Sequence, residues 1–354
     1  MRSLEARVKR IVLGYATQSL AIRYPANNAT IPMPHATPSS VKLLLAFAAV
    51  YVVWGSTYLA ILFAIETLPP FLMAGVRFVI AGGLLYTWVW ATGGGARPTR
   101  EQWLATAIVG VLLLLCGNGL VVWSETRVAS GVTALLVGTV PCWMVLLDWL
   151  RRGGIRPSAQ VVVGLTLGLG GLVWLIGPDA LMGGGRPDLL GAAAVVLASF
   201  SWAAGSIYSR QAKMPSSPFL STAMQMLAGG VALLTLGLLL GEPWRFDPAA
   251  FSLRSMAALA YLIVFGSIVA FTAYVWLLRV STPARVSTYA YVNPVVAVLL
   301  GWVLANEALT MRMAIAASII VSGVALITMA PKPAAARAAP AEACAAPADA
   351  AARD

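Results

Sequence analysis

Aromatic and polar side chains recur at helical spacing inside several apolar runs of this sequence. Two runs, over 43–64 and 187–209, each hold three such residues three and four positions apart, and a third run over 284–304 holds a pair. Polar groups in hydrocarbon are costly unless they face protein or a wet cavity, so these stripes are predicted to point inward. In order, the sets are Tyr51, Trp54 and Tyr58; Ser199, Trp202 and Ser206; and Tyr289 and Asn293.

Such amphipathic surfaces suit small organic ligands better than bare ions. Asn118, between Gly117 and Gly119, is a further candidate, although its neighbours also suit close helix packing. Each residue has a structural alternative, because Ser and Asn bond between helices and Trp and Tyr gather at membrane interfaces. The predicted substrate-binding residues are Trp54, Tyr58, Asn118, Trp202, Ser206, Tyr289 and Asn293.

The composition shows which elements must position these residues. Of 354 residues, 60% are hydrophobic and only 10% charged. Soluble domains have roughly 45–50% apolar and about 25% charged residues, so a single soluble domain is excluded. We predict an all-α polytopic membrane protein, because each apolar run matches the roughly 20 residues of a membrane helix. The ten predicted spans cover 43–64, 71–91, 103–123, 128–150, 158–177, 187–209, 217–239, 255–279, 284–304 and 311–330.

The net charge of +11 serves as a topology signal rather than as a nucleic-acid surface. With the N-terminus in the cytoplasm, eighteen Lys and Arg residues fall on the cytoplasmic side and five on the other. Both termini are therefore predicted to be cytoplasmic, as an even number of spans requires. The segment 1–40 is expected to be a disordered extension, with Met33 as a possible native start, and 331–354 a disordered Ala/Pro-rich tail.

Charged residues within and beside the spans are few. Arg77 is the only basic residue well inside a span, six residues past Phe71 or about 9 Å along the axis. It could hold a substrate carboxylate, but snorkelling or pairing with Glu66 is the interpretation that we favour. No Asp or Glu occupies the middle of a span, so coupling to protons would need a rim acid such as Glu125 or Glu307. Arg77, Glu125 and Glu307 are the predicted charge or coupling residues.

The two halves of the chain resemble each other. Trp123 and Trp276 lie 153 residues apart, and so do Pro141 and Pro294. Five spans per half is an odd number, so the second half enters the membrane inverted, which predicts a 5+5 inverted-topology repeat over 41–178 and 186–330. The prolines are predicted helix breaks or gates, each freeing a carbonyl four residues earlier, although ordinary kinks are the alternative.

Several short motifs extend across both halves. They are Trp54-Gly55-Ser56-Thr57-Tyr58, Ala74-Gly75-Val76-Arg77-Phe78, Gly117-Asn118-Gly119, Trp123-Ser124-Glu125, Val140-Pro141, Asn293-Pro294 and Asn306-Glu307-Ala308-Leu309-Thr310. Together they resemble the drug/metabolite transporter superfamily, specifically proteins with two tandem EamA-type domains, over about 41–330. The resemblance implies a ten-helix transporter of the bacterial inner membrane that exports amino acids or other small metabolites. Glu307 maps to Gly154 in the first half, so a role for that glutamate is not duplicated.

The residues themselves favour a secondary transporter with alternating access over other classes. One histidine and three cysteines without a CxxC motif predict no metal or other cofactor, and no P-loop occurs. The alternative is an intramembrane enzyme acting on a lipid or small amphiphile, although the spans offer no catalytic constellation. The expected partners are a small organic substrate and the lipid bilayer, with no nucleic acid, and a homodimer is left open.

Overall fold

The computed structural model describes most of the spans and the loops between them. The expected N-terminal extension, except for its last two residues, and the whole expected tail lie outside the described residues, as does Glu307. The described ranges are 39–93, 97–128, 130–151, 153–154, 156–181, 188–245, 252–305 and 310–330.

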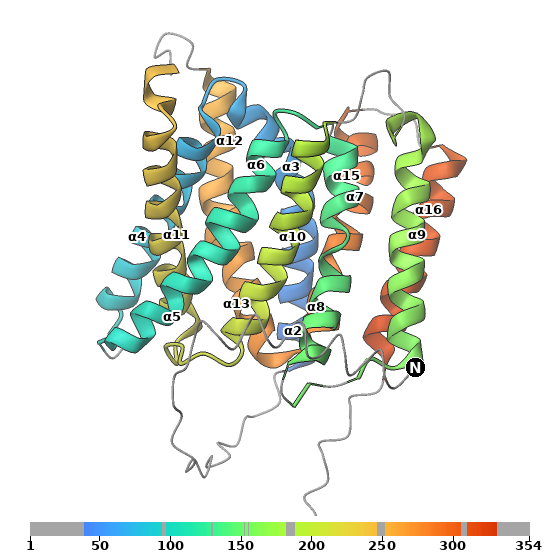
Figure 1. Ribbon diagram of the computed structural model, residues 1–354, viewed down its shortest axis with the longest axis horizontal. Coiled ribbons are helices and arrows are strands. Elements are labelled where there is room, and N and C mark those ends of the chain that lie inside the picture. The colour runs from blue at the N-terminus through green and yellow to red at the C-terminus, as the bar shows by residue number, and fades with distance from the viewer. Residues whose placement is uncertain are drawn as a thin grey trace, which may run out of the picture.

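Helices form all ten predicted spans within this part of the chain (Figure 1). Three spans contain π-helical stretches, labelled η1, η2 and η5. Among the described residues, seven stretches are long and apolar enough to cross a membrane. The first half consists of α2 (Ser40–Ala48), η1 (Ala49–Val53), α3 (Trp54–Ile65), α4 (Pro70–Ala91), α5 (Arg100–Gly110), η2 (Val111–Gly119), α6 (Leu120–Ser124), α7 (Ser130–Val137), α8 (Val140–Leu150) and α9 (Ala159–Leu181).

The second half repeats this pattern in the same order. Its elements are α10 (Leu189–Ser209), α11 (Pro218–Leu239), the short 3-10 helix η3 (Glu242–Arg245), α12 (Leu253–Tyr261), η5 (Leu262–Phe271), α13 (Thr272–Val280), α14 (Pro283–Val286), α15 (Tyr289–Ala305) and α16 (Met311–Met329).

The packing of the helices relates the two halves by a pseudo-twofold axis. The first span packs through α3 against α12 and α15 of the eighth and ninth spans, and the sixth span, α10, packs against η2 and α8 of the matching third and fourth spans. The second spans of the two halves, α4 and α11, lie side by side, as do the fifth spans, α9 and α16 (Figure 1). Because α10 runs in the opposite direction to α3, the repeat is inverted.

Glycines allow the two helix pairs on the axis to pack closely. A Cβ atom on Gly75 of α4 would lie 2.7 Å from Cγ of Leu234 on α11. A Cβ atom on Gly164 of α9 would lie 2.6 Å from Cγ1 of Ile327 on α16. Both separations are shorter than a carbon–carbon contact, so any larger residue would push the helices apart.

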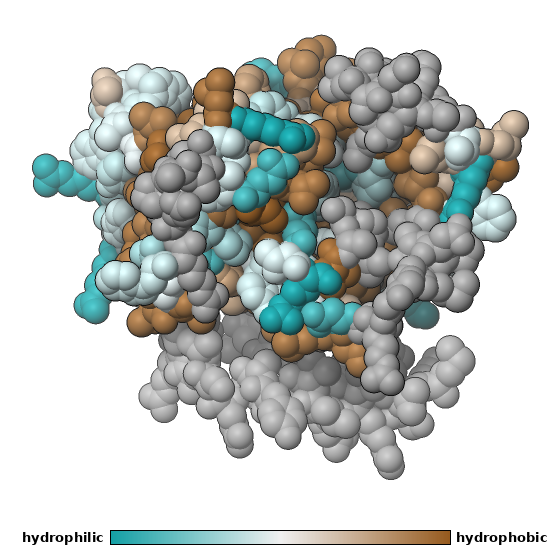
Figure 2. Space-filling model, turned by 90° about the horizontal axis from the view of Figure 1, so that it is seen from above, coloured by the Kyte–Doolittle hydropathy of each residue, from teal (hydrophilic) through white to brown (hydrophobic). Residues whose placement is uncertain are grey.

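Hydrophilic side chains lie at the upper end of the bundle, and one charged residue there has a structural role. Figure 2 looks onto the upper end, where hydrophilic side chains lie near the middle with hydrophobic ones among them. Glu242, after α11, is buried and accepts hydrogen bonds from the backbone N–H groups of Phe71 (3.1 Å) and Leu72 (2.8 Å). These N–H groups belong to the first turn of α4, where no intrahelical partner exists. A carboxylate from the second half thus caps a helix of the first.

We expect Glu242→Ala to destabilise the protein by about 2 kcal/mol, because two buried N–H groups would lose a charged acceptor. The melting temperature of the purified protein in detergent measures this loss. Glu101→Ala is the matched control, since Glu101 forms an exposed ion pair with Lys213 and should contribute little. Equal melting temperatures for the two variants would contradict the capping role.

Candidate substrate cavity

A cavity of about 90 Å³ lies between the two halves of the bundle. Its wall is built from α3, α4, η2, α6, α7, α8, α10, η5 and α15, so both repeats contribute to it. Most of the predicted substrate-binding residues lie on this wall, and Arg77 lies there too. The predicted residues that line the cavity are Trp54, Tyr58, Asn118, Trp202, Tyr289 and Asn293.

The π-helical stretches bring backbone carbonyls to the residues of the opposite repeat. A π-turn is wider than an α-turn and leaves carbonyl oxygens accessible to neighbouring side chains. Trp54 Nε1 donates to the carbonyl of Gly266 in η5 at 3.1 Å. Ser201 Oγ donates to the carbonyl of Leu112 in η2 at 2.9 Å. Each bond joins one repeat to the other, and the bond from Trp54 to Gly266 joins two residues of the cavity wall.

Asn293 supplies a third such bond. With its amide nitrogen placed to satisfy the surrounding acceptors, it donates to the carbonyl of Tyr289 at 3.0 Å and to that of Tyr51 in η1 at 3.2 Å. Asn293 is almost fully buried, where an unpaired amide would be costly. Its amide nitrogen therefore serves the backbone of η1, while the residue also forms part of the cavity wall.

Aromatic rings around Trp54 form one side of the cavity. Its ring meets Trp202 at 5.6 Å and Tyr289 at 4.9 Å between centroids, both close to perpendicular. Tyr274, fully buried behind them, lies 5.0 Å from Trp54. Edge-to-face contacts of this kind fix ring orientation as well as burying surface. The result is a rigid aromatic wall made from α3, α10, α13 and α15.

Ser206 does not line the cavity. Its hydroxyl donates to the backbone carbonyl of Trp202 at 2.7 Å and meets the hydroxyl of Tyr274 at 2.6 Å. The indole Nε1 of Trp202 donates to the same Tyr274 oxygen at 2.8 Å. Ser206 and Tyr274 therefore orient Trp202 from behind, a role that the helical spacing of Ser206 does not reveal.

The two prolines lie in different local structures. Pro141 is buried in the first turn of α8, just after the break between α7 and α8. Pro294 lies inside α15, and the break in that span comes earlier, between α14 and α15. The interruptions thus fall in matching spans but at different depths. A gating role for either proline stays a prediction.

Arg77 is not positioned as we expected. Its side chain is only 4% exposed, so it does not snorkel to the interface. Glu66, its expected partner, instead pairs with Arg254 at 3.5 Å. Arg77 Nε donates to Ser267 Oγ at 2.8 Å, and Nη1 has no hydrogen-bond partner among the described residues. The favoured structural interpretation of Arg77 is therefore wrong.

The sequence analysis did not predict several residues of the cavity wall. Gly117 and Gly266 belong to η2 and η5, and a Cβ atom on Gly117 would lie 2.8 Å from Cε3 of Trp202. The glycine lets Trp202 lie directly against the π-helix. Phe271, Thr57 and Ile61 complete this part of the wall. A glycine inside an apolar run was the available signal, but it predicts close packing in general and not a cavity.

Glu125 follows the last turn of α6, outside the membrane-spanning segment. Its carboxyl is partly buried, and Oε1 has no partner among the described residues. Burial raises the pKa of Glu125 to about 8. Tyr58 of the cavity wall is close enough to interact electrostatically with this carboxyl. Glu125 can therefore gain or lose a proton near neutral pH.

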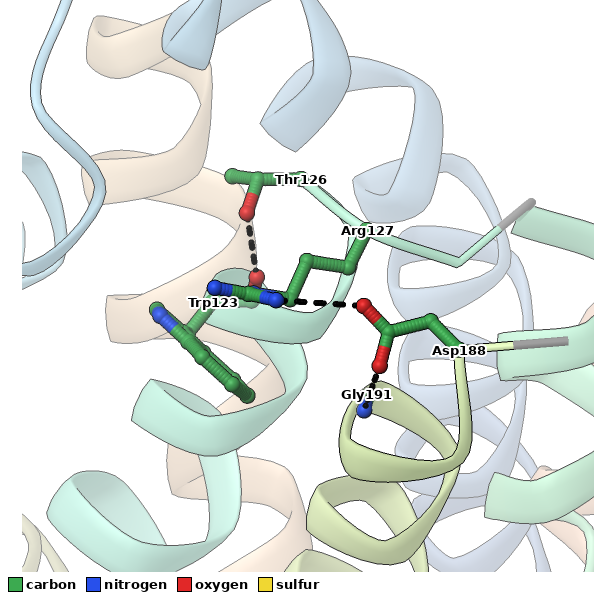
Figure 3. A network of polar contacts seen from close by, with 5 residues as sticks. All are labelled: Trp123, Thr126, Arg127, Asp188 and Gly191. Carbon is green, nitrogen blue, oxygen red and sulfur yellow. Dashed lines mark hydrogen bonds and ion pairs between the residues drawn. The ribbon is translucent and has the colours of Figure 1, made fainter.

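The basic residue two positions after Glu125 is already engaged (Figure 3). Arg127 Nη1 donates to Asp188 Oδ2 at 3.1 Å, and its guanidinium lies over the Trp123 ring. The Gly191 N–H and Arg127 both donate to Asp188 and hold the pKa of that carboxyl below its ordinary value. Asp188 also caps α10, so this network fastens the end of the third span to the start of the sixth.

We expect a pH-dependent stability that Glu125 causes. Its pKa is about 8 in the folded protein against 4.5 ordinarily, so the folded state holds the proton more tightly. Stability should then fall as pH rises from about 4.5 to 8, and Glu125→Gln should flatten that decline. Melting temperatures across this range measure it, with Glu101→Gln as an exposed control. Parallel curves for wild type and Glu125→Gln would contradict the assignment.

Comparison with known proteins finds similar membrane proteins over nearly the full length of the helical bundle. The model of the EamA-like transporter family matches residues 41–177 and 189–329. The uncharacterized inner membrane transporter YedA of Escherichia coli strain K12 is 40% identical over 290 residues, which cover 82% of this chain and 91% of YedA. The uncharacterized transporter YoaV of Bacillus subtilis strain 168 is 23% identical over 288 residues, or 81% of this chain and 97% of YoaV.

A solved crystal structure of a protein shares the fold, with a TM-score of 0.65 at 23% sequence identity. The match covers 82% of this chain and 98% of that chain. Two family matches that follow each other along the sequence agree with the two inverted halves of the bundle. This chain belongs to the EamA-like transporter family.

Proposed function

We propose that this protein is a secondary transporter of the bacterial inner membrane that exports amino acids or other small organic metabolites. The observation that carries the proposal is the cavity between two inverted repeats, lined by aromatic and polar side chains from both. Inverted repeats adopt two related conformations by exchanging roles, which opens a shared site to alternate sides. A small cavity of about 90 Å³ fits a conformation in which neither side is widely open.

The proposed orientation places both termini in the cytoplasm. The start of α2 and the end of α16 lie at the same end of the bundle (Figure 1). Arg285 at this end donates from Nη2 to the carbonyl of Ala330 at 2.9 Å. Most Lys and Arg residues were assigned to this side, which supports its cytoplasmic placement.

Solute counterflow tests the proposal directly. Purified protein in proteoliposomes loaded with unlabelled amino acids, one at a time, should accumulate the same labelled compound from outside without any imposed gradient. A second arm with an imposed proton gradient tests coupling through the rim acids Glu125 and Glu307. Absence of counterflow across amino acids and other small metabolites, by protein shown to be folded, would contradict transport through this cavity.

We expect Trp202→Ala to lower the initial counterflow rate about tenfold, because the loss of one ring from the aromatic wall costs about 1.4 kcal/mol of binding. Trp174→Ala is the matched control, since Trp174 on α9 is 55% exposed on the outside of the bundle. Equal rates for the two variants, at equal reconstitution, would remove Trp202 from the substrate path.

A further inference from the structure

We infer that Arg77 is the binding site for a carboxylate of the transported molecule. The inference rests on the proposed function and narrows it, since it assigns the substrate class to acids and excludes simple amines and neutral compounds. It also assigns one residue of the wall as the specificity determinant.

The first argument is that Arg77 is a buried cation without an anion. It is 4% exposed and stands in α4, a membrane-spanning helix. None of the four ion pairs in the described part of the chain includes it. A buried charge is costly unless it is paired, and Phe78, whose ring centroid lies 4.7 Å from Arg77 Cζ, offsets only part of this cost.

The second argument is that the guanidinium is held in place from one side only. Nε of Arg77, in the first repeat, donates a hydrogen bond to Ser267 Oγ on η5 of the second repeat. A Cβ atom on Gly266 would lie 2.9 Å from Nη2, so a larger residue there would crowd the guanidinium. Trp54 in turn holds the Gly266 carbonyl. The π-helix of the second repeat thus fixes the guanidinium and leaves Nη1 without a partner in the described part of the chain.

The third argument is the chemistry of the remaining wall. A guanidinium presents donors in a planar fork that matches a carboxylate better than a spherical anion. The aromatic rings of Trp54, Trp202 and Tyr289 offer a surface for an apolar group next to the acid. Asn118 Oδ1, which has no partner within the described ranges either, adds an acceptor for a donor group on the same molecule. An organic acid with an apolar portion and a hydrogen-bond donor would contact all three features, namely the guanidinium, the aromatic rings and Asn118 Oδ1.

Equilibrium binding to the purified full chain tests the inference independently of transport. The probes are three acid–amide pairs, namely acetate and acetamide, leucine and leucinamide, and phenylalanine and phenylalaninamide, with sodium chloride as a simple anion. Ligand-induced shifts of the melting temperature report binding. For at least one pair, the acid should bind about tenfold or more tighter than the amide, as expected for a charged hydrogen bond.

Variants then assign that preference to one side chain. Arg77→Gln should bring acid and amide to within about twofold of each other, while Arg77→Lys keeps a reduced preference because the charge remains without the fork. The empty Arg77→Gln protein should melt at the same temperature as wild type or higher, because an uncompensated buried charge is removed. Arg254→Gln, in an exposed ion pair, is the matched control and should bind like wild type.

The outcomes separate this inference from the proposed function. Counterflow of amines or neutral compounds, unaffected by Arg77→Gln, would overturn the inference and leave transport intact. Acid binding that Arg77→Gln abolishes, without any counterflow, would support the inference and contradict transport. The inference would be overturned if the amides bound as tightly as the acids. It would also be overturned if chloride bound as tightly as the acids, or if no acid bound. If Arg77→Gln does not fold, two other measurements decide the question. The first is the binding of the acid–amide pairs to the wild-type protein. The second is their binding to Ser267→Ala, which is expected to weaken binding of the acid and leave binding of the amide unchanged.

Discussion

Backbone carbonyls inside a membrane must find a hydrogen-bond partner within the protein, and this requirement organises the centre of the bundle. The π-helical stretches η1, η2 and η5 each offer a backbone carbonyl to a side chain of the other repeat, and the Gly266 carbonyl belongs to a residue of the cavity wall. Their partners are side chains of the opposite repeat: Asn293 for Tyr51, Ser201 for Leu112 and Trp54 for Gly266. These bonds between the repeats hold the two halves together at the centre of the bundle.

This exchange of bonds constrains how the cavity can open. The pairs α4–α11 and α9–α16 pack at glycine contacts that leave little room for sliding. Between these pairs, α3 and α10 each pack against helices of the other repeat. α3 provides Trp54, and α10 provides Trp202 and Ser201. Any separation of the repeats must replace the bonds from Trp54 and Ser201 with water or substrate. A ligand that bridges the two repeats can offset that loss, which links binding to conformational change.

The sequence predicted the membrane helices, the inverted repeat and the aromatic and polar part of the cavity wall for one reason: polarity at helical spacing within apolar runs has few explanations. It failed for apolar and small wall residues such as Ile61 and Thr57 of α3, and also where the local backbone departs from an ideal helix. Nothing in Val111–Gly119 or Leu262–Phe271 distinguishes a π-helix from an α-helix, so Gly266 and Phe271 were not recognised. Ser206 has the spacing of a wall residue, yet its hydroxyl bonds to Trp202 and Tyr274. Periodicity gives the face of a helix but not the partner of each side chain.

Two charged residues buried near α4 show how structure separates a structural charge from a functional one. Both oxygens of Glu242 accept backbone N–H groups of the first turn of α4, so this carboxylate is used completely by the fold. Arg77, about one and a half turns further along the same helix, has one bond from Nε, and its Nη1 has no hydrogen-bond partner among the described residues. A chain that stabilised Arg77 for packing alone would place an acid beside it, as it does for Arg254 and Arg127 at the surface. Within the described residues Arg77 has no such acid, and the carboxylate site proposed above accounts for this, because a transported acid would supply the anion only while it is bound.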